Sequence, residues 1–479
     1  MTNTGQLNRS SPVQPKLIYA WIVIGGFTLL TTLCLFARFS NILQIAFPVG
    51  TFFIGIFLYF RYPILYLGFT WWIWFLSPLV SRLVEYQNSL TDPGFRLIIL
   101  SPYLVTLCTG ITFFRDIPKL YKREGLPFVL AFSALMYALL IGLAQGNSLT
   151  RVIQVMLSWL PGIFLGFHLL ANWQQYPAYR ENTQKVFYWG VLVMGIYGIV
   201  QYIVAPDWDK FWLTNAEDLQ LCCGWPEPFM IRVWSTLNYP FTFGYAMMAC
   251  LLLLLSHQNT ASIPAIIAGL LSFLLSQVRG AWIGFAVGLI IFFSSLNLRL
   301  KLRLILTIFI IATFLVPLAS SGPLFDVITS RILTLSSGQD DGSAMERQRI
   351  YAELFNSVIG EFIGKGMGET SIVDAGLLDI LNTLGWFGLF LYGVGMYLLF
   401  YSLFSYAEAR FDPFMNASRS IVASIFVTLP FNNSMILLPG VLFWGFGGMV
   451  LAANRYYCYQ KKCHLNNRDR SKYSPIREV

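Results

Sequence analysis

The stretch SQVRGAWIG (276–284) places one arginine between two long apolar runs. Arg279 is the only charged residue between His257 and Arg299. A guanidinium group suits phosphate, because its planar fork donates two parallel hydrogen bonds. An ionisable residue at membrane depth is also a functional candidate by default. The stretch therefore indicates a phosphate-binding Arg279. The alternative is a loop residue that caps a helical hairpin or extends toward lipid headgroups.

Two further segments carry basic residues beside apolar runs. RVWSTLNYPFTFGY begins with Arg232 and leads straight into a candidate span. The later segment GSAMERQRIYAELFNSVIGEFIGKGMGET holds Arg347, Arg349 and Lys365. Apolar residues at helical spacing predict an amphipathic helix over 346–362, either packed on the membrane or a plain surface helix with solvated charges. We expect the glycines around Lys365 to form a flexible segment that wraps a ligand.

A carboxylate follows this segment, in IVDAGLLDILNTLGWFGLF. We expect Asp374 at the membrane boundary and Asp379 about one helical turn inside it. A carboxylate at that depth can accept a proton from a sugar hydroxyl during glycosyl transfer. Asp374 is equally suited to be the N-cap of the next helix, and one residue can serve in both roles. We select Asp374 as the candidate catalytic base, beside Arg279.

Several other chemistries lack their motifs. The sequence contains no HExxH, no GxSxG and no Walker A motif. The seven cysteines form no recognisable disulfide framework, and a bridge between the adjacent Cys222 and Cys223 would be strained. We therefore predict that the protein uses no metal and no other cofactor.

The composition defines the class of protein that must position these residues. Of the 479 residues, 56% are hydrophobic and 11% are charged, against roughly 25% charged residues in soluble domains. Too few polar residues remain to cover several soluble cores. The net charge of +9 fits the excess of basic residues on the cytoplasmic side of membrane proteins, so we predict no nucleic-acid partner.

Apolar runs of membrane-spanning length predict an all-α polytopic membrane protein with about 12–14 transmembrane helices and two long extracytoplasmic loops. The candidate spans are 17–36, 41–60, 63–81, 97–114, 126–144, 152–171, 186–204, 239–256, 261–276, 280–297, 302–320, 376–404, 418–434 and 438–456. The number of spans stays open because of two pairs of runs. One pair is 41–60 with 63–81, and the other is 261–276 with 280–297, which flank Arg279.

The spans divide the chain into three parts. We predict a disordered cytoplasmic N-terminus over 1–16, a transmembrane domain over 17–456 and a basic cytoplasmic tail over 457–479. The long loops are expected at about 205–238 and 321–375. An even number of spans places both termini on one side, and the basic tail assigns that side to the cytoplasm. Lys and Arg then fall inside rather than outside by nearly two to one.

The outer side of a bacterial cytoplasmic membrane carries one abundant phosphate substrate suited to such arginines, the sugars linked to a lipid diphosphate. A cluster of cations would hold that diphosphate and stabilise it as it leaves. The expected location is therefore the bacterial cytoplasmic (inner) membrane, with several passes and with membrane lipid as a partner.

These motifs together resemble the O-antigen ligase and O-antigen polymerase superfamily of bacterial envelope glycosyltransferases. SQVRG is similar to the family's S-x-x-R-G, and RVWSTLNYPFTFGY is similar to its pattern of Arg, Thr and Asn-Pro. The late loop adds a basic amphipathic helix, a G-x-G-x-G run and a span that opens on a Gly-x-x-Gly pair, here Gly385 and Gly388. The resemblance covers roughly residues 225–400.

The resemblance implies a metal-independent transferase that joins a glycan from a polyprenyl-diphosphate-linked donor to a glycan acceptor. It implies that Arg279 and Arg232 bind the donor diphosphate, together with Arg347 or Arg349. We add Lys365 to this set. Ligases of the family carry a histidine at the position of Asp374, and this departure favours a polysaccharide polymerase.

Two alternatives stay open. One is a ligase that transfers a finished glycan to a lipid or protein acceptor. The other is a transporter or flippase for lipid-linked glycans, since such proteins also have about a dozen spans and internal arginines. The absence of a visible sequence repeat and the basic character of both long loops favour an enzyme.

Overall fold

The computed structural model describes most of the chain. It covers residues 17–89, 96–120, 124–215, 222–256, 262–296, 301–302, 349, 351–352, 355, 358–369, 375–405 and 411–472, with side chains as far as 463. Within these ranges most residues are helical, and only an isolated antiparallel bridge joins Gly224 to Ile231. The prediction of an all-α protein is confirmed.

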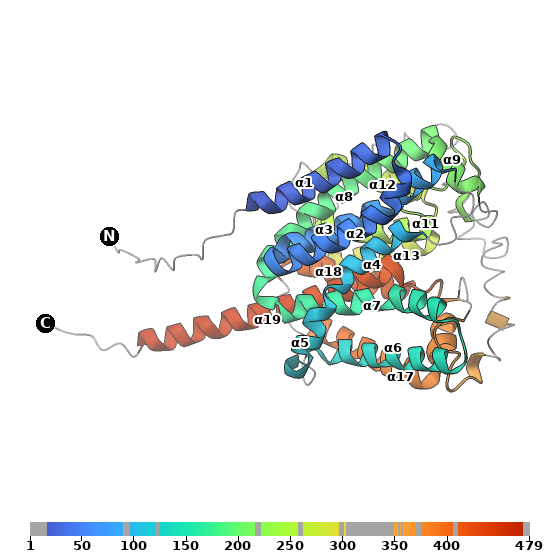
Figure 1. Ribbon diagram of the computed structural model, residues 1–479. Helices are drawn as coiled ribbons and strands as arrows, with labels where there is room; N and C mark the ends of the chain where they lie inside the picture. Colours follow the sequence, from blue (N-terminus) through green and yellow to red (C-terminus); the bar gives the residue numbers. More distant parts are fainter. Residues whose placement is uncertain are drawn as a thin grey trace, which may run out of the picture.

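The helices pack as one bundle (Figure 1). In chain order they are α1 (Leu17–Phe36), α2 (Ser40–Arg61), α3 (Pro63–Gln87), η1 (Leu97–Leu100), α4 (Ser101–Leu107), α5 (Gly110–Leu120), α6 (Leu126–Ala144), α7 (Leu149–Ala171), η2 (Trp173–Gln175), α8 (Tyr176–Val204), α9 (Asp207–Thr214), α11 (Pro240–Leu255), α12 (Ile263–Leu275), α13 (Arg279–Ser294), α17 (Gly376–Ser405), α18 (Pro413–Val427) and α19 (Leu437–Lys472).

The described chain includes 9 helical segments long and apolar enough to cross a membrane, plus three shorter apolar helices, α11, α12 and α13. This confirms a polytopic membrane protein, while the span number stays a prediction. The run expected at 302–320 lies outside the described residues, apart from residue 302. The run expected at 418–434 is replaced by α18 and a turn, because the helix ends at Val427.

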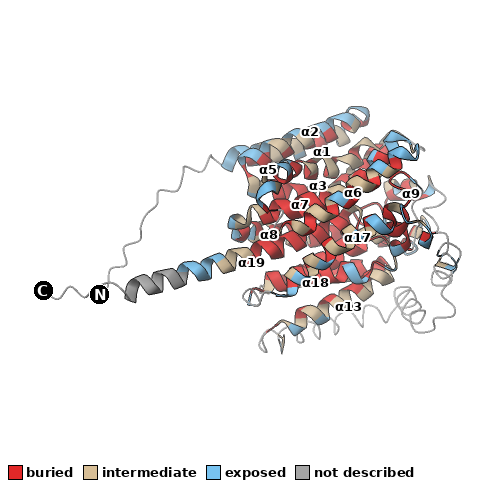
Figure 2. Cartoon of the chain, turned by 90° about the horizontal axis from the view of Figure 1, so that it is seen from below, coloured by how far each residue is buried: buried red, intermediate tan, exposed pale blue. Residues whose placement is uncertain are grey.

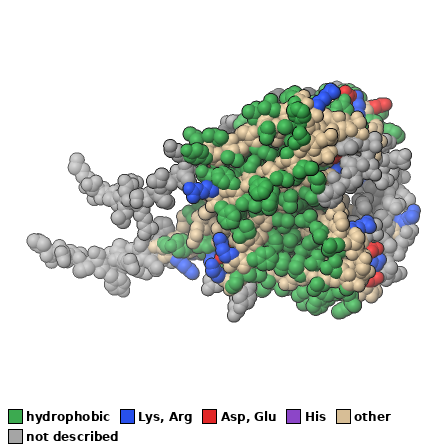
Figure 3. Space-filling view, in the orientation of Figure 1, with side chains coloured by type: hydrophobic (Ala, Val, Ile, Leu, Met, Phe, Trp, Pro, Cys, Tyr) green, Lys and Arg blue, Asp and Glu red, His purple; other side chains and the backbone are tan. Residues whose placement is uncertain are grey.

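The core lies where α7 crosses α19. A Cβ on Gly166 would lie 2.3 Å from the carbonyl oxygen of Trp444, and one on Gly448 would lie 2.1 Å from the carbonyl oxygen of Gly166. Glycine is needed here because only its backbone permits so close a crossing. Figure 2 shows buried residues concentrated in these central helices, and Figure 3 shows apolar side chains over the flank with charged ones toward the ends.

The bundle has two distinct ends. Helix α1 begins and α19 finishes at the same end, drawn at the left of Figure 1, which we call the terminal end. Helix α9 and the start of α17 lie at the opposite end. We call it the loop end, and it also holds segment 222–239, which follows α9. The described basic residues Arg232, Arg279 and Lys365 belong to segments of the loop end.

Candidate functional site

Two of the basic motifs lie side by side at the loop end. The guanidinium of Arg232 donates through Nη1 to the carbonyl oxygen of Cys222 at 2.6 Å and through Nη2 to that of Gln277 at 3.2 Å. The amide of Val233 donates to the carbonyl oxygen of Leu275 at 3.1 Å. Segment 222–239 is thereby fixed to the turn between α12 and α13. The guanidinium of Arg232 therefore holds the protein's own backbone through these hydrogen bonds.

The turn between α12 and α13 presents Arg279 at the start of a helix. Helix α12 ends at Leu275, Gln277 adopts a left-handed backbone with φ +56°, and Val278 is extended. A left-handed residue reverses the chain within a few positions, although it is unfavourable for a residue with a Cβ. Arg279 is then the first residue of α13, and its side chain is half-buried.

Small residues hold the start of α13 close to α18. Gly280, Gly284 and Gly288 follow Arg279 at four-residue spacing and therefore share one helix face. A Cβ on Gly284 would lie 3.0 Å from Cγ2 of Thr428, the residue that directly follows α18. Because these glycines permit close packing, Arg279 begins a helix that lies directly against α18.

The turn between α18 and α19, residues 428–436, contacts a second helix start. The side-chain amide of Asn433 donates to Oδ2 of Asp379 at 2.7 Å, and both side chains are buried. Asp379 lies in the first turn of α17. The hydroxyl of Tyr351 donates to the carbonyl oxygen of Pro430 at 3.0 Å. Helix α13, which begins with Arg279, and helix α17, which carries Asp379 in its first turn, therefore both pack near this turn.

Several of the predicted site residues cannot be compared with this geometry. Asp374 and Arg347 lie outside the described residues. Arg349 is helical and exposed, as expected for the amphipathic segment. Their roles stay predictions.

Helix α17 is broken at Gly385, which has φ 62° and ψ 179°. In a regular helix the amide of Trp386 would donate to the carbonyl oxygen of Asn382. Here it donates to the carbonyl oxygen of Phe362 at 3.0 Å, and the Asn382 oxygen accepts from the amide of Lys365 at 2.8 Å. The backbone groups released by the break are thus paired by a second segment, as membrane depth requires.

That second segment contains Lys365 and is fixed between α6 and α17. Gly364 and Gly366 have φ +81° and +69°, and a Cβ on Gly366 would lie 2.1 Å from the amide nitrogen of Gly142. The amide of Met367 donates to a carbonyl oxygen of α6 at 3.0 Å. The expectation of a flexible run is therefore wrong, because its glycines fit a narrow space between two helices, whereas ligand binding by Lys365 stays a prediction.

A buried ion pair, which sequence reasoning missed, supports the loop end. Nη1 of Arg82 lies 2.8 Å from Oδ1 of Asp209, and both side chains are 0% exposed. Nη2 of Arg82 also donates to the carbonyl oxygen of Ser235 at 2.5 Å. The guanidinium lies 5.8 Å from the ring centroid of Trp234. Arg82 therefore ties α3 and α9 to the segment that carries Arg232.

Gln201 of α8 completes this network. Its Nε2 donates to Oδ2 of Asp209 at 3.0 Å, and its Oε1 accepts from the amides of Trp234 at 3.0 Å and Ser235 at 2.8 Å. The sequence signal was a charged or polar residue at the edge of an apolar run, which also describes many surface residues.

Helix α9, within the region predicted as the first long loop, contains the Asp-x-Asp sequence Asp207-Trp208-Asp209, which bears on the prediction of no metal. Asp209 is committed to Arg82, whereas the side chain of Asp207 is 74% exposed and lies 3.7 Å from Nζ of Lys210. The two carboxylates therefore have different partners and surroundings. Within the described residues no group of three or more His, Cys, Asp or Glu is placed to hold a metal ion.

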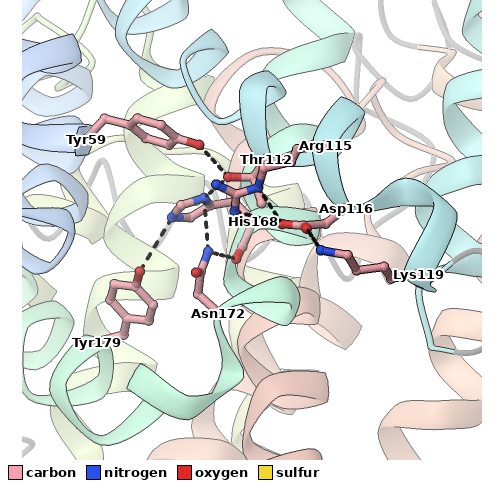
Figure 4. A network of polar contacts seen from close by, with 8 residues as sticks. All are labelled: Tyr59, Thr112, Arg115, Asp116, Lys119, His168, Asn172 and Tyr179. Atoms are coloured by element: carbon pink, nitrogen blue, oxygen red, sulfur yellow. Dashed lines mark hydrogen bonds and ion pairs between the residues drawn. The ribbon is translucent and has the colours of Figure 1, made fainter.

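The terminal end has polar clusters of its own. Nδ1 of His168 lies 2.8 Å from Oγ1 of Thr112, which lies 2.6 Å from the hydroxyl of Tyr59 (Figure 4). The carboxylate of Asp412 accepts from Tyr176 at 2.6 Å and also pairs with Arg180. These contacts join α2, α5 and α7 in one case and α8 with the start of α18 in the other, which indicates a packing role.

No family model matches the chain, and no curated protein matches it. The fold and composition define a polytopic α-helical membrane protein.

Proposed function

We propose that the protein is a glycosyltransferase of the O-antigen polymerase and ligase type. It joins glycan units from a polyprenyl-diphosphate-linked donor at the outer face of the bacterial cytoplasmic membrane, and both termini lie in the cytoplasm. The observation that carries the proposal is the contact of Arg232 with the turn that precedes Arg279. Two basic motifs, each beside an apolar run, thereby meet at one end of a membrane bundle.

The proposed reaction needs a stabilised leaving group. An acceptor sugar hydroxyl attacks the anomeric carbon of the donor with inversion, and the bond from that carbon to the diphosphate oxygen breaks. Arg279 contacts the departing diphosphate, because a guanidinium offers paired donors to phosphate oxygens. The remaining diphosphate ligands in the proposal are Arg347, Arg349 and Lys365.

Arg232 receives two tasks. Its guanidinium donates to the backbone carbonyls of Cys222 and Gln277, so its first task is to position the turn before Arg279. Its second task is to add positive charge near the diphosphate. Asp374 accepts the hydroxyl proton. No metal or cofactor takes part in this scheme.

One observation favours the second candidate, a transporter or flippase. Helix α17 is interrupted at Gly385, and broken helices are common in transporters. The interruption is filled by the segment around Lys365. The test must therefore separate glycan extension from lipid movement.

The test is glycan profiling of a deletion strain that expresses wild-type protein, Arg279→Ala, Arg279→Lys or Asp374→Asn at equal membrane levels. Lys185→Ala serves as a control, because Lys185 is exposed on α8 at the terminal end. We expect Arg279→Ala and Asp374→Asn to leave single units or short lipid-linked oligomers, and Arg279→Lys to restore part of the polymer.

The other outcomes decide between the candidates. If the deletion strain still makes long polymer and this polymer stays on its lipid carrier, the protein is a ligase. Full complementation by both Arg279→Ala and Asp374→Asn would refute the transferase. Flipping of a lipid-linked glycan by the purified protein in proteoliposomes, without extension, would then establish the transporter.

A further inference from the structure

Two adjacent thiols lie against each other at the loop end. The Sγ atoms of Cys222 and Cys223 are 2.8 Å apart, closer than two non-bonded sulfur atoms normally approach. A disulfide bond is about 2.05 Å long, so a movement of less than an ångström separates the thiols from a bond. Cys223 is 0% exposed, whereas Cys222 is half-buried.

The backbone of the same two residues holds Arg232. The carbonyl oxygen of Cys222 accepts from Nη1 of Arg232 at 2.6 Å, and that of Cys223 accepts from its backbone amide at 2.9 Å. The bridge between Gly224 and Ile231 closes this short hairpin. Any change in the Cys222–Cys223 peptide therefore moves two of the carbonyl oxygens that accept hydrogen bonds from Arg232.

We propose that Cys222 and Cys223 form a reversible vicinal disulfide, a redox-sensitive site that alters how Arg232 is held. Neighbouring Cα atoms are about 3.8 Å apart across a trans peptide, below the usual disulfide range of about 4.4–6.8 Å. Such a bond is strained, and strained disulfides are readily reduced. The bridge is therefore suited to respond to redox conditions rather than to brace the fold permanently.

The chemistry needs an external disulfide as oxidant, either an envelope dithiol oxidase or glutathione disulfide. The more accessible Cys222 attacks as its thiolate and displaces one thiolate of the oxidant. Cys223 then loses its proton and attacks Sγ of Cys222, which releases the second. The cysteines lose two protons and two electrons, and the oxidant gains the electrons to become two thiols.

The surroundings assign the order of attack. The hydrogen bond with Cys222 and then burial raise the pKa of Cys223 above its ordinary value. Cys223 therefore stays protonated and out of reach of the oxidant until Cys222 carries a mixed disulfide. Cys222 is the attacking thiol and Cys223 the resolving thiol.

The first experiment measures the bridge on the full chain in membranes. Membranes are treated with a reductant or with glutathione disulfide, and the protein is then denatured and alkylated with N-ethylmaleimide. After proteolysis, mass spectrometry measures the mass of the peptide that contains both cysteines. We expect two labels after reduction, and after oxidation an unlabelled peptide lighter by two hydrogen atoms. The buried Cys108 and Cys250 are internal controls that should be labelled in both samples, because the oxidant cannot reach them before denaturation.

The Cys222→Ser variant distinguishes a vicinal bridge from other oxidation. In this variant we expect Cys223 to remain a labelled thiol under glutathione disulfide. Two labels on the oxidised wild-type peptide would refute the proposal. So would a glutathione adduct on Cys222 that never resolves, or loss of the Cys223 label in Cys222→Ser.

The oxidising surroundings of the site rest on the proposed orientation, with the loop end outside. A membrane-impermeant maleimide applied to intact, reduced cells tests that orientation separately. We expect it to label Cys222 and to leave the exposed Cys463 unlabelled until the cells are permeabilised. The reverse pattern would refute the orientation and the outer-face transferase, whereas the peptide masses would still decide whether the bridge forms.

Discussion

Arg82 and Asp209 show how single residues organise the loop end. Each is fully buried, and each pairs with the other and with further groups. Burying two charges is costly, so such a pair is better evidence for fixed geometry than for high stability. Here the ion pair fixes the backbone at Ser235, three residues after Arg232.

We predict that breaking this pair is far more damaging than removing it. Arg82→Met leaves Asp209 buried without its cation, and such a loss costs about 3–5 kcal/mol. The double variant Arg82→Met with Asp209→Leu should lose less, because no unpaired charge remains. Thermal unfolding of the detergent-solubilised protein, followed by size-exclusion chromatography, measures both.

An exposed pair supplies the control. Lys185 and Glu181 lie 2.7 Å apart with both side chains 69% exposed, and exposed pairs contribute little. Lys185→Ala should leave the melting temperature unchanged. If Arg82→Met melts at the wild-type temperature, the pair does not hold the loop end.

The position of Arg279 was predictable from the sequence, whereas that of Arg82 was not. A charged residue that interrupts two apolar runs must lie near the end of a helix, and Arg279 does begin α13. Arg82 lies at the edge of one apolar run, and its partner is on a distant segment. Sequence spacing carries no information about that pairing, because tertiary packing creates it.

At the scale of elements, the break in α17 and the segment around Lys365 form one structural unit, because each pairs the backbone groups of the other. The helix gives up a hydrogen bond at Asn382, and the inserted segment provides the missing donor. The glycine run is typical of a flexible loop when it is considered alone. Its fixed conformation could not be predicted, because it depends on the space between α6 and α17.

We predict that Gly366→Ala destabilises the protein strongly. The left-handed backbone alone costs an alanine about 1–2 kcal/mol, and the new Cβ would lie 2.1 Å from the amide nitrogen of Gly142. Gly393→Ala is the matched control on α17, since nothing lies within 4 Å of its Cβ. Equal melting temperatures for Gly366→Ala and wild type would show that the segment is not fixed as described.

At the scale of the whole molecule, the two ends differ in what they present. Helix α19 has 36 residues and is therefore about 54 Å long, which exceeds the hydrocarbon thickness of about 30 Å. Its last turns extend past the bundle at the terminal end (Figure 1). Composition and the lengths of apolar runs were sufficient to predict this class of molecule. The apolar run around α18 predicted a span that ends at residue 434, whereas the helix ends at Val427, because apolar residues also form the turn at 428–436.

The orientation of the molecule yields the last prediction. Alkaline phosphatase is active only outside the cytoplasm, and green fluorescent protein is fluorescent only within it. We expect phosphatase activity from a fusion after residue 214, at the end of α9, and fluorescence from fusions after residues 256 and 479. The reason is that basic residues favour the cytoplasmic side, and the last part of α19 carries Lys461, Lys462, Arg468, Arg470 and Lys472. The inverse pattern would place Arg279 and the α18–α19 turn in the cytoplasm. A lipid-linked donor on the outer face could then not reach them, and the transferase would have to be abandoned even though the bundle itself would be unchanged.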